Sequence, residues 1–342
     1  MSELVLIANA GDGTISTLRL HREPAPRLEL LATSDVGPGV GTFAIDAQRD
    51  LVYAAFKGDP AGIATMRLDR GDGQLTELSR RAVDSSLSYL CLGRGGSVLL
   101  GASYGGGFAS TWPVDGGNPR GVGHLGDPVA RVSFANAHCI LAHAGHAYVV
   151  SLGEDLVAQF SVEADGRLQP LEPPTVAAPA GSGPRHLVID GRNAYLMTEF
   201  SGEALRFEIE DDGGLVRKEA VPAYDPSASL SPSRFGADPV AEHLIWGADL
   251  HVAGPWLLCS ERSASTIATL PIRDGRLGQA VAFAPTQPQP RGFAVTADGS
   301  YVVAVGELAT SAALSRVQDD GHLAQLDQIP IGRAANWVRI VS

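Results

Sequence analysis

Short apolar runs and polar turns alternate along this chain in a unit that recurs seven times. Each copy has an apolar run, a turn with glycine or polar residues, and a second run of alternating character, as in LVLIANAGDGTISTLRL from Leu4. The other copies begin at Leu51, Val98, Ala147, Ala194, Trp256 and Tyr301. The starts lie about 45 to 50 residues apart, the period of a β-propeller blade. The pattern predicts an all-β fold, a seven-bladed β-propeller.

The turns and the segments between the copies indicate four-stranded blades. Acidic-Gly pairs close tight hairpins where positive φ is needed, and they follow the second run in five copies, at Asp72-Gly73, Asp165-Gly166, Asp212-Gly213, Asp274-Gly275 and Asp320-Gly321. A further strand candidate precedes six of the copies, at Thr42, Ser88, His138, Arg185, Ala248 and Arg291.

The first copy has no such strand before it, whereas the chain ends with NWVRIV at residues 336–341. This segment has the length and character of the missing strand. We expect the C-terminal strand to join the N-terminal blade and close the ring, because closure hides sheet edges that would otherwise pair with other chains.

Residues 1–342 are therefore expected to form a single propeller domain with one inserted loop at residues 222–243. That segment is dense in Pro, Ser and Asp, which is typical of a surface loop. Two interpretations stay open: an insertion without function, or a lid or wall over a site.

Charge and composition restrict the partners. The formal net charge is −12 over 342 residues, and basic residues form no run, so a nucleic-acid partner is not expected. No apolar run reaches bilayer length, no signal peptide is recognisable, and the three cysteines are far apart, so we expect no membrane partner and a cytoplasmic location. The sequence predicts no particular oligomeric state.

Three long segments carry a specific resemblance: GSGPRHLVIDGRNAYLMTE at residues 181–199, GADLHVAGPWLLCSER at 247–262 and QPQPRGFAVTADGSYVVAVGE at 287–307. They resemble the propeller-type lactonase family, which includes bacterial 6-phosphogluconolactonases and the similar fungal carboxy-cis,cis-muconate cyclases. The resemblance covers essentially the whole chain. It implies a lactonase, a carboxylic ester hydrolase, that needs no cofactor and no metal.

The resemblance also implies four catalytic residues: His138, Arg185, Glu199 and Arg262. Lactone hydrolysis needs a base for the attacking water and donors for the oxyanion. His138 and Glu199 are the candidate bases. Arg185 and Arg262 are suited to bind the oxyanion or an anionic group of the substrate. Arg291 opens an inner strand as Arg185 does, and we expect it to bind substrate.

Structural roles are the alternative for each of these residues: a strand cap for His138, blade-to-blade hydrogen bonds for Arg185, and charge neutralisation for Glu199. Strand alternation predicts that His186, next to Arg185, faces the opposite side and packs. Asp249 and His251 share a strand face, but two ligands are too few to identify a metal site, and a structural role is favoured.

The leading hypothesis is hydrolysis of an anionic small molecule, 6-phosphogluconolactone, to 6-phosphogluconate. Another aldonolactone and a muconate-type cycloisomerase reaction are alternatives. A non-catalytic propeller that serves as a binding platform is the alternative from a different class, because a fold does not define a function.

Overall fold

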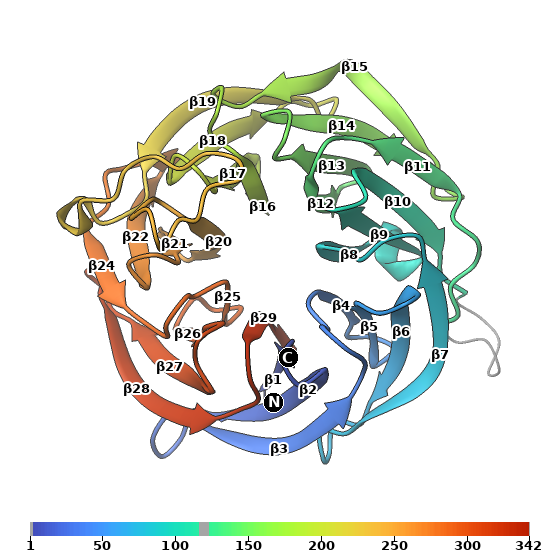
Figure 1. Cartoon of the computed structure of the whole chain (residues 1–342), viewed down its shortest axis with the longest axis horizontal. Helices are drawn as coiled ribbons and strands as arrows, with labels where there is room; N and C mark the ends of the chain where they lie inside the picture. Colours follow the sequence, from blue (N-terminus) through green and yellow to red (C-terminus); the bar gives the residue numbers. More distant parts are fainter. Residues whose placement is uncertain (1–2, 116–122, 342) are drawn as a thin grey trace.

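The computed structural model describes residues 3–115 and 123–341 and arranges their strands in seven sheets around a central axis (Figure 1). Within each blade the strands run antiparallel from the axis outwards. The prediction of an all-β, seven-bladed propeller with four-stranded blades is confirmed. Among the described residues, no helix is long and apolar enough to cross a membrane.

Each of the first three blades runs from an inner strand to an outer strand. The first has β29 (Ala335–Val341), β1 (Glu3–Asn9), β2 (Thr14–His21) and β3 (Arg27–Asp35). The second has β4 (Phe43–Asp46), β5 (Leu51–Phe56), β6 (Ala61–Leu68) and β7 (Leu75–Val83). The third has β8 (Tyr89–Gly93), β9 (Val98–Ser103), β10 (Phe108–Pro113) and β11 (Ala130–Ser133), with the 3-10 helix η1 (Arg94–Gly96) after β8.

The remaining blades follow in the same order. They are β12 (Ala137–His143), β13 (His146–Ser151), β14 (Leu156–Val162) and β15 (Leu168–Ala177); then β16 (Pro184–Asp190), β17 (Asn193–Thr198), β18 (Glu203–Ile209) and β19 (Leu215–Pro222). The sixth has β20 (Gly247–Ala253), β21 (Trp256–Glu261) and β22 (Thr266–Arg273), with β23 (Arg276–Leu277) and β24 (Ala282–Pro285) both paired to β22. The seventh has β25 (Gly292–Val295), β26 (Tyr301–Val305), β27 (Ser311–Val317) and β28 (Leu323–Pro330).

Burial explains why the second strand and the outer strand of a blade differ in composition. The second strands, such as β5 and β9, lie between neighbouring blades and are buried at every position. They therefore read as continuous apolar runs, because both faces of the strand contact the core. The outer strand β7 is exposed or half-buried after its first residue, which matches its polar composition.

The turn between β18 and β19 shows why the acidic-Gly pairs recur. Gly213 has φ +87°, and a Cβ atom there would lie 2.5 Å from the ring of His146 in the neighbouring blade. Its carbonyl oxygen accepts a hydrogen bond from the hydroxyl of Tyr148 at 2.8 Å. Glycine is required at this position both by the backbone conformation and by the contact between blades.

The ring is closed as expected by the two ends of the chain. Strand β29 pairs antiparallel with β1, with Leu4 opposite Val341 and Ala8 opposite Trp337. Trp337 is 4% exposed, and its indole N–H donates to the Phe43 carbonyl of the next blade at 3.1 Å. The last strand therefore completes the first blade and contacts the second.

The long connection between β19 and β20 includes the 3-10 helix η2 (Pro226–Ala228) and crosses the face of the ring on which the inner strands begin (Figure 1). Phe235 and Val240 in it are exposed. None of residues 222–243 lines the central pocket described below, although Trp246, shortly after them, does.

Removal of the last seven residues tests the closure. A chain that ends at Ala335 should aggregate or fail to fold, because it exposes the edge of β1 and the apolar surface that Trp337 and Val338 cover. Size-exclusion chromatography and circular dichroism of the truncated protein measure this. A monomeric product with an unchanged melting temperature would contradict the expectation.

Candidate active site

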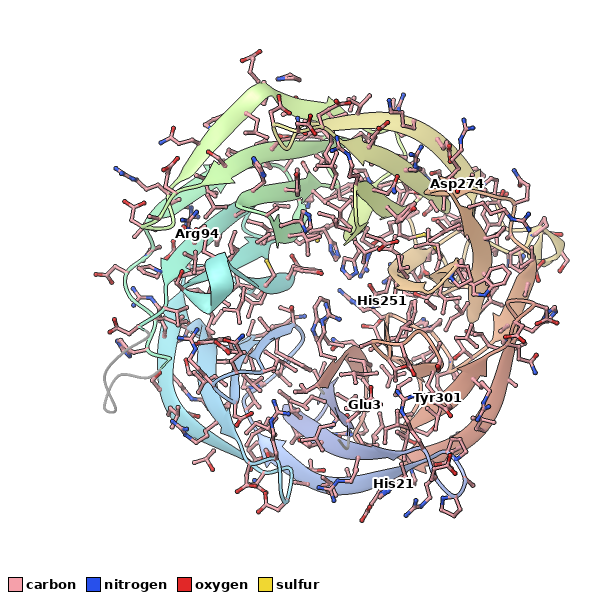
Figure 2. All side chains as sticks on the ribbon, turned by 180° about the vertical axis from the view of Figure 1, so that it is seen from behind. Glu3, His21, Arg94, His251, Asp274 and Tyr301 are labelled. Atoms are coloured by element: carbon pink, nitrogen blue, oxygen red, sulfur yellow. The ribbon has the colours of Figure 1, made fainter. Side chains whose placement is uncertain are left out.

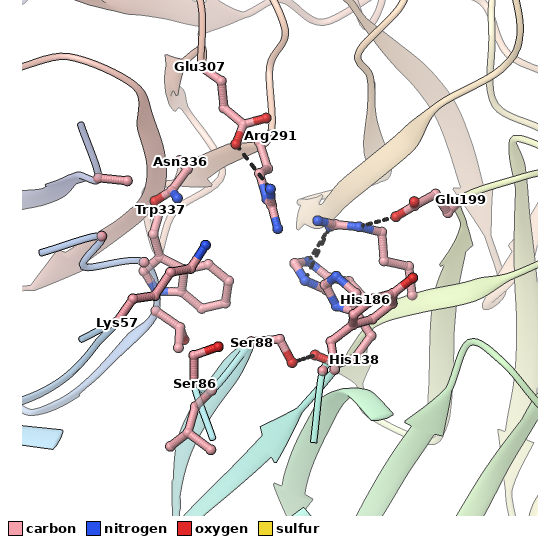
Figure 3. Close-up of a pocket in the computed structure, with 18 of the residues that line it drawn as sticks. Lys57, Ser86, Ser88, His138, His186, Glu199, Arg291, Glu307, Asn336 and Trp337 are labelled. Carbon is pink, nitrogen blue, oxygen red and sulfur yellow. Dashed lines mark hydrogen bonds and ion pairs between the residues drawn. The ribbon is translucent and has the colours of Figure 1, made fainter. Parts of the chain in front are cut away.

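A pocket of about 480 Å³ opens at the centre of the ring, where the inner strands begin and the second strands end. Its walls come from all seven blades. All five site residues expected from the sequence line it: His138, Arg185, Glu199, Arg262 and Arg291. Figure 3 shows three of them, His138, Glu199 and Arg291, around the pocket, each from a different blade. Residues up to 153 positions apart in the chain thus meet in one pocket because each blade contributes the same two strand ends.

β-bulges at the strand starts aim several of these side chains. The pairing of β12 with β13 shifts register at His138, and that of β16 with β17 shifts at Arg185. Strand β20 shifts between Gly247 and Leu250, and β29 shifts at Asn336. A bulge places an extra residue in one strand and redirects its side chain. Four of the inner strands therefore carry this irregularity at the pocket.

The bulge at Arg185 also makes one prediction wrong. Strict alternation would turn His186 away from the pocket, but the register shift between Pro184 and His186 breaks the alternation. His186 lines the pocket together with Arg185. Only the pairing of β16 with β17 reveals this, because a bulge has no signal in the local sequence.

A buried cluster of Arg185, Glu199 and Arg262 forms one side of the pocket. Arg185 Nε donates to Glu199 Oε2 at 2.8 Å, and Arg262 Nη2 lies 3.1 Å from the same oxygen. Glu199 Oε1 accepts from the indole N–H of Trp246 at 3.3 Å. The Arg262 guanidinium also stacks on Trp246, with Cζ 3.7 Å from the ring centroid. Both carboxylate oxygens are thus engaged with this cluster.

The charges of this cluster follow from its burial. Burial alone would raise the pKa of Glu199, but Arg262, Arg185 and Arg291 outweigh it and lower that pKa below 4.5. Burial lowers the pKa of Arg262 to about 9, and Glu199 limits the shift. At neutral pH, Glu199 is therefore an anion between guanidinium cations and does not titrate.

His138 has a different environment. It is 4% exposed and packs edge-on against His186 and Tyr104, with ring centroids 5.0 and 5.8 Å away. Burial, followed by the charge of Arg185 and the neighbouring His186, lowers the pKa of His138 well below 6.5. Its Nδ1 atom has no hydrogen-bond partner among the residues that the structure describes. The ring is therefore neutral at pH 7.

The other side of the pocket is more exposed. Arg291 is held by Glu307 at 3.0 Å, and its side chain is 37% exposed. Lys57, Ser86, Asn336 and Trp337 line the same region, and Figure 3 shows the Lys57 amine directed into the pocket. No acid within ion-pair distance of Lys57 occurs in residues 3–115 or 123–341.

Lys57 was not among the site residues expected from the sequence. It is one of only two lysines in the chain. The rarity of lysine is the one feature of the sequence that distinguishes Lys57, and it does not indicate where in the fold this residue lies. The structure places Lys57 after the end of β5, on the pocket face.

Asp249 is a buried carboxylate between inner strands, and His251 is one of its partners. Asp249 is 3% exposed and lies 2.8 Å from His186 Nδ1 and 3.3 Å from His251 Nε2. It also accepts from the backbone N–H of Phe293 at 3.4 Å. Asp249 thus links three neighbouring inner strands. Within the described part of the chain, no group of three or more His, Cys, Asp or Glu side chains is placed to hold a metal ion.

The pocket as a whole is cationic. Four basic side chains, Lys57, Arg185, Arg262 and Arg291, line it together with two carboxylates, Glu199 and Glu307, and the two histidines are neutral. The fold and the site define a seven-bladed β-propeller with a central, positively charged pocket of small-molecule size.

The chain matches the family described as Lactonase, 7-bladed beta-propeller, over residues 5–340. It belongs to this family and is an enzyme of the lactonase class. The family resemblance seen in the sequence is thereby confirmed.

Named relatives agree with this assignment. The chain is 28% identical to a 6-phosphogluconolactonase of Serratia proteamaculans over 356 residues, covering 100% of both chains. It is 27% identical to a 6-phosphogluconolactonase of Sodalis glossinidius over 353 residues, again covering 100% of both. A solved structure, the periplasmic gluconolactonase of Pseudomonas aeruginosa, shares the fold with a TM-score of 0.84 and 21% identity over 100% of this chain and 99% of that one.

Replacement of Glu199 by Gln tests its role in the cluster. The change leaves two buried guanidinium groups without their anion, so we expect a loss of about 3 to 5 kcal/mol in the free energy of unfolding at pH 7. Because the pKa of Glu199 is lowered on folding, its stabilisation is complete above 4.5 and decreases as the pH falls through the folded value. The gap between wild type and variant should therefore narrow in acid.

Urea denaturation of both proteins between pH 7 and pH 3 measures the gap. Glu208→Gln is the matched control, because Glu208 pairs with Lys218 at 3.1 Å on the surface and its loss should leave stability unchanged. A gap for Glu199→Gln that is absent at pH 7, or that widens in acid, would contradict this assignment of charge.

Proposed function

We propose that the protein hydrolyses 6-phosphogluconolactone to 6-phosphogluconate. The observation that carries the proposal is a neutral His138, without a side-chain hydrogen bond to any described residue, beside two buried arginines in a cationic pocket. The names of the Serratia and Sodalis relatives support the choice of substrate. The pocket volume of about 480 Å³ suits one phosphorylated sugar lactone.

The two sides of the pocket have different roles in this proposal. Arg185 and Arg262 are almost fully buried and face the reacting carbonyl group. Lys57 and Arg291 are more exposed and bind the phosphate, which remains hydrated on its outer side. Arginine and lysine both bind phosphate, and desolvating the carbonyl rather than the phosphate is the less costly arrangement.

Hydrolysis proceeds in two steps. Water attacks the lactone carbonyl carbon while His138 accepts a proton from it, and the carbonyl oxygen becomes an oxyanion that Arg185 and Arg262 stabilise. The tetrahedral intermediate then breaks its bond to the ring oxygen, which takes the proton from His138. The product is the open hydroxy acid, and its carboxyl group loses a proton to solvent.

His138 rather than Glu199 is the base in this scheme. The Glu199 oxygens accept from Arg185 and Trp246 and lie beside Arg262, and this engagement lowers the pKa of the carboxylate. Such a carboxylate is a weak proton acceptor, and it serves to hold the two arginines. His138 is neutral, its side chain forms no hydrogen bond with the residues that the structure describes, and it gains basicity when the substrate anion offsets the nearby arginines.

The cationic pocket also assists substrate capture. The protein carries a formal net charge of −12, which repels an anionic lactone at long range. Four basic side chains at the centre of the ring reverse the local potential and direct the anion to the pocket.

We infer a cytoplasmic location. All three cysteines, Cys91, Cys139 and Cys259, are free thiols, which is usual in a reducing compartment. The proposed substrate is a phosphorylated sugar derivative, which is a class of intracellular metabolite.

A direct assay tests the function. Acid release from the phosphorylated and unphosphorylated δ-gluconolactones is followed at a pH where spontaneous opening is slow, and a carboxymuconate is included. Rapid opening of the phosphorylated lactone supports the proposal. Preference for the unphosphorylated lactone would assign another aldonolactone, turnover of the muconate alone would assign cycloisomerase chemistry, and no turnover would favour a binding platform.

His138→Ala should lower kcat by about 100-fold to 10,000-fold, because general-base assistance to water is removed. The control is His143→Ala, at the far end of the same strand and outside the pocket, which should retain the wild-type rate. In the wild type, the acid limb of kcat/KM should lie well below pH 6.5, since the pKa of His138 is lowered. Full activity of His138→Ala would rule out this base.

Lys57→Ala and Arg291→Ala should each raise KM for the phosphorylated lactone about 10-fold or more and leave KM for the unphosphorylated lactone nearly unchanged, since only the former has the charge they bind. Steady-state kinetics on both substrates measure the difference. Lys218→Ala, the other lysine of the chain, is the matched control and should alter neither value. Equal effects on both substrates would contradict the assigned phosphate position.

A further inference from the structure

His186 is a buried side chain of the pocket to which the proposed reaction assigns no task. It is 3% exposed, and its Nδ1 lies 2.8 Å from Asp249 Oδ1 on the adjacent inner strand. Arg185 Nη1 lies against the same ring, 3.2 Å from His186 Nε2 and 3.5 Å from His186 Nδ1. His186 thus stands between a buried carboxylate and an arginine of the pocket.

The carboxylate determines which ring nitrogen carries the proton. Burial would raise the pKa of Asp249, but His251 and His186 lower it well below its ordinary value, so Asp249 is ionised and only accepts hydrogen bonds. His186 Nδ1 must therefore be the N–H that donates to it. Burial, with Arg185 next in weight, lowers the pKa of His186 to about 3, so the ring stays neutral and Nε2 keeps a free lone pair.

This lone pair completes the set of acceptors around Arg185. A guanidinium has five N–H donors. Nε–H donates to Glu199 at 2.8 Å, and the Nη1 donors face the Ala248 carbonyl oxygen at 2.6 Å and His186 Nε2 at 3.2 Å. Nη2 has no acceptor among the described residues. Its two N–H groups are the ones left for a ligand in the pocket that Arg185 lines.

We propose that Asp249 and His186 are positioning residues, which orient Arg185 so that its Nη2 donors face the substrate. Asp249 sets the tautomer of His186, and His186 Nε2 accepts from Arg185 Nη1. With the other tautomer, the nearer ring nitrogen would carry an N–H, and only Nδ1, at 3.5 Å, could accept from Arg185 Nη1. The orientation of Arg185 follows from these contacts, whereas its effect on catalysis rests on the proposed lactone hydrolysis.

Three variants test the successive contacts from Asp249 through His186 to Arg185. Asp249→Asn removes the obligatory acceptor, and His186→Phe keeps the ring packing against Tyr89 and Trp337 but removes both nitrogens. Each should lower kcat about 10-fold to 100-fold and change KM less than about threefold, the scale of an outer contact that orients a reacting group. His186→Gln restores an acceptor near the Nε2 position and should recover most of the loss in kcat.

His251→Asn is the matched control. His251 contacts the same carboxylate at 3.3 Å. Figure 2, which views the propeller from behind, shows His251 beside the central axis. It does not line the pocket. If Asp249 served only to hold the inner strands together, His251→Asn and His186→Phe would lower kcat alike; we expect kcat of His251→Asn within about twofold of wild type.

Nitrogen-15 NMR of the arginine side chains gives a readout that does not depend on turnover. In the wild type, the bonds at Nε and Nη1 should keep the two Nη resonances of Arg185 distinct, whereas exchange should merge them in His186→Phe and Asp249→Asn but not in His251→Asn. Arg185→Lys identifies the signals by their loss. Unchanged Arg185 resonances in folded His186→Phe would overturn the proposal, as would a kcat deficit that only follows the unfolded fraction.

The two proposals fail in different ways. If no lactone is hydrolysed by the wild type but the Arg185 resonances respond as expected, the proposed function fails and the positioning role stands. If lactone hydrolysis is rapid and His186→Phe, Asp249→Asn and wild type have equal kcat, the positioning role fails alone. Should His186→Phe not fold, Asp249→Asn provides the same comparison with the wild type.

Discussion

The pairing of β29 with β1 is the constraint on which the rest of the molecule depends. It joins the two ends of the chain in one blade, with Val338 fully buried and Trp337 bonded to the second blade. Each blade packs mainly against its two neighbours, so an unclosed ring would leave two blades each without one of them. Closure also brings Asn336 and Trp337 into the pocket wall, so the contact that stabilises the fold contributes to the site.

Bulges turn this repeated architecture into a particular pocket. A regular inner strand would direct alternate side chains to the axis, whereas the shifts at His138, Arg185 and Asn336 present extra residues there. The shift at Arg185 lets two successive polar residues share one wall. Both Arg185 and His186 are almost fully buried, which is tolerable because their nitrogens find acceptors in Glu199, Ala248 and Asp249.

Electrostatics connects stability and chemistry at this pocket. Two guanidinium groups that are 1% and 3% exposed require a carboxylate, and Glu199 supplies it. The same contact lowers the pKa of Glu199 and makes it a poor base, so the proposed reaction assigns proton transfer to the neutral His138. The role of each charged residue in the pocket thus depends on its neighbours and not on its residue type alone.

The sequence by itself determined the blades and the order of their strands. Seven copies of one pattern, the acidic-Gly turns and the spare C-terminal strand follow from backbone preferences and from the burial of each strand, which are local properties. Family motifs also indicated His138, Arg185, Glu199, Arg262 and Arg291, and all five line the pocket. Only the tertiary structure placed Lys57 there, turned His186 towards Arg185, and gave Glu199 its lowered pKa. These features arise from strand register and from contacts between blades, which join residues far apart in the chain and leave no periodic signal along it.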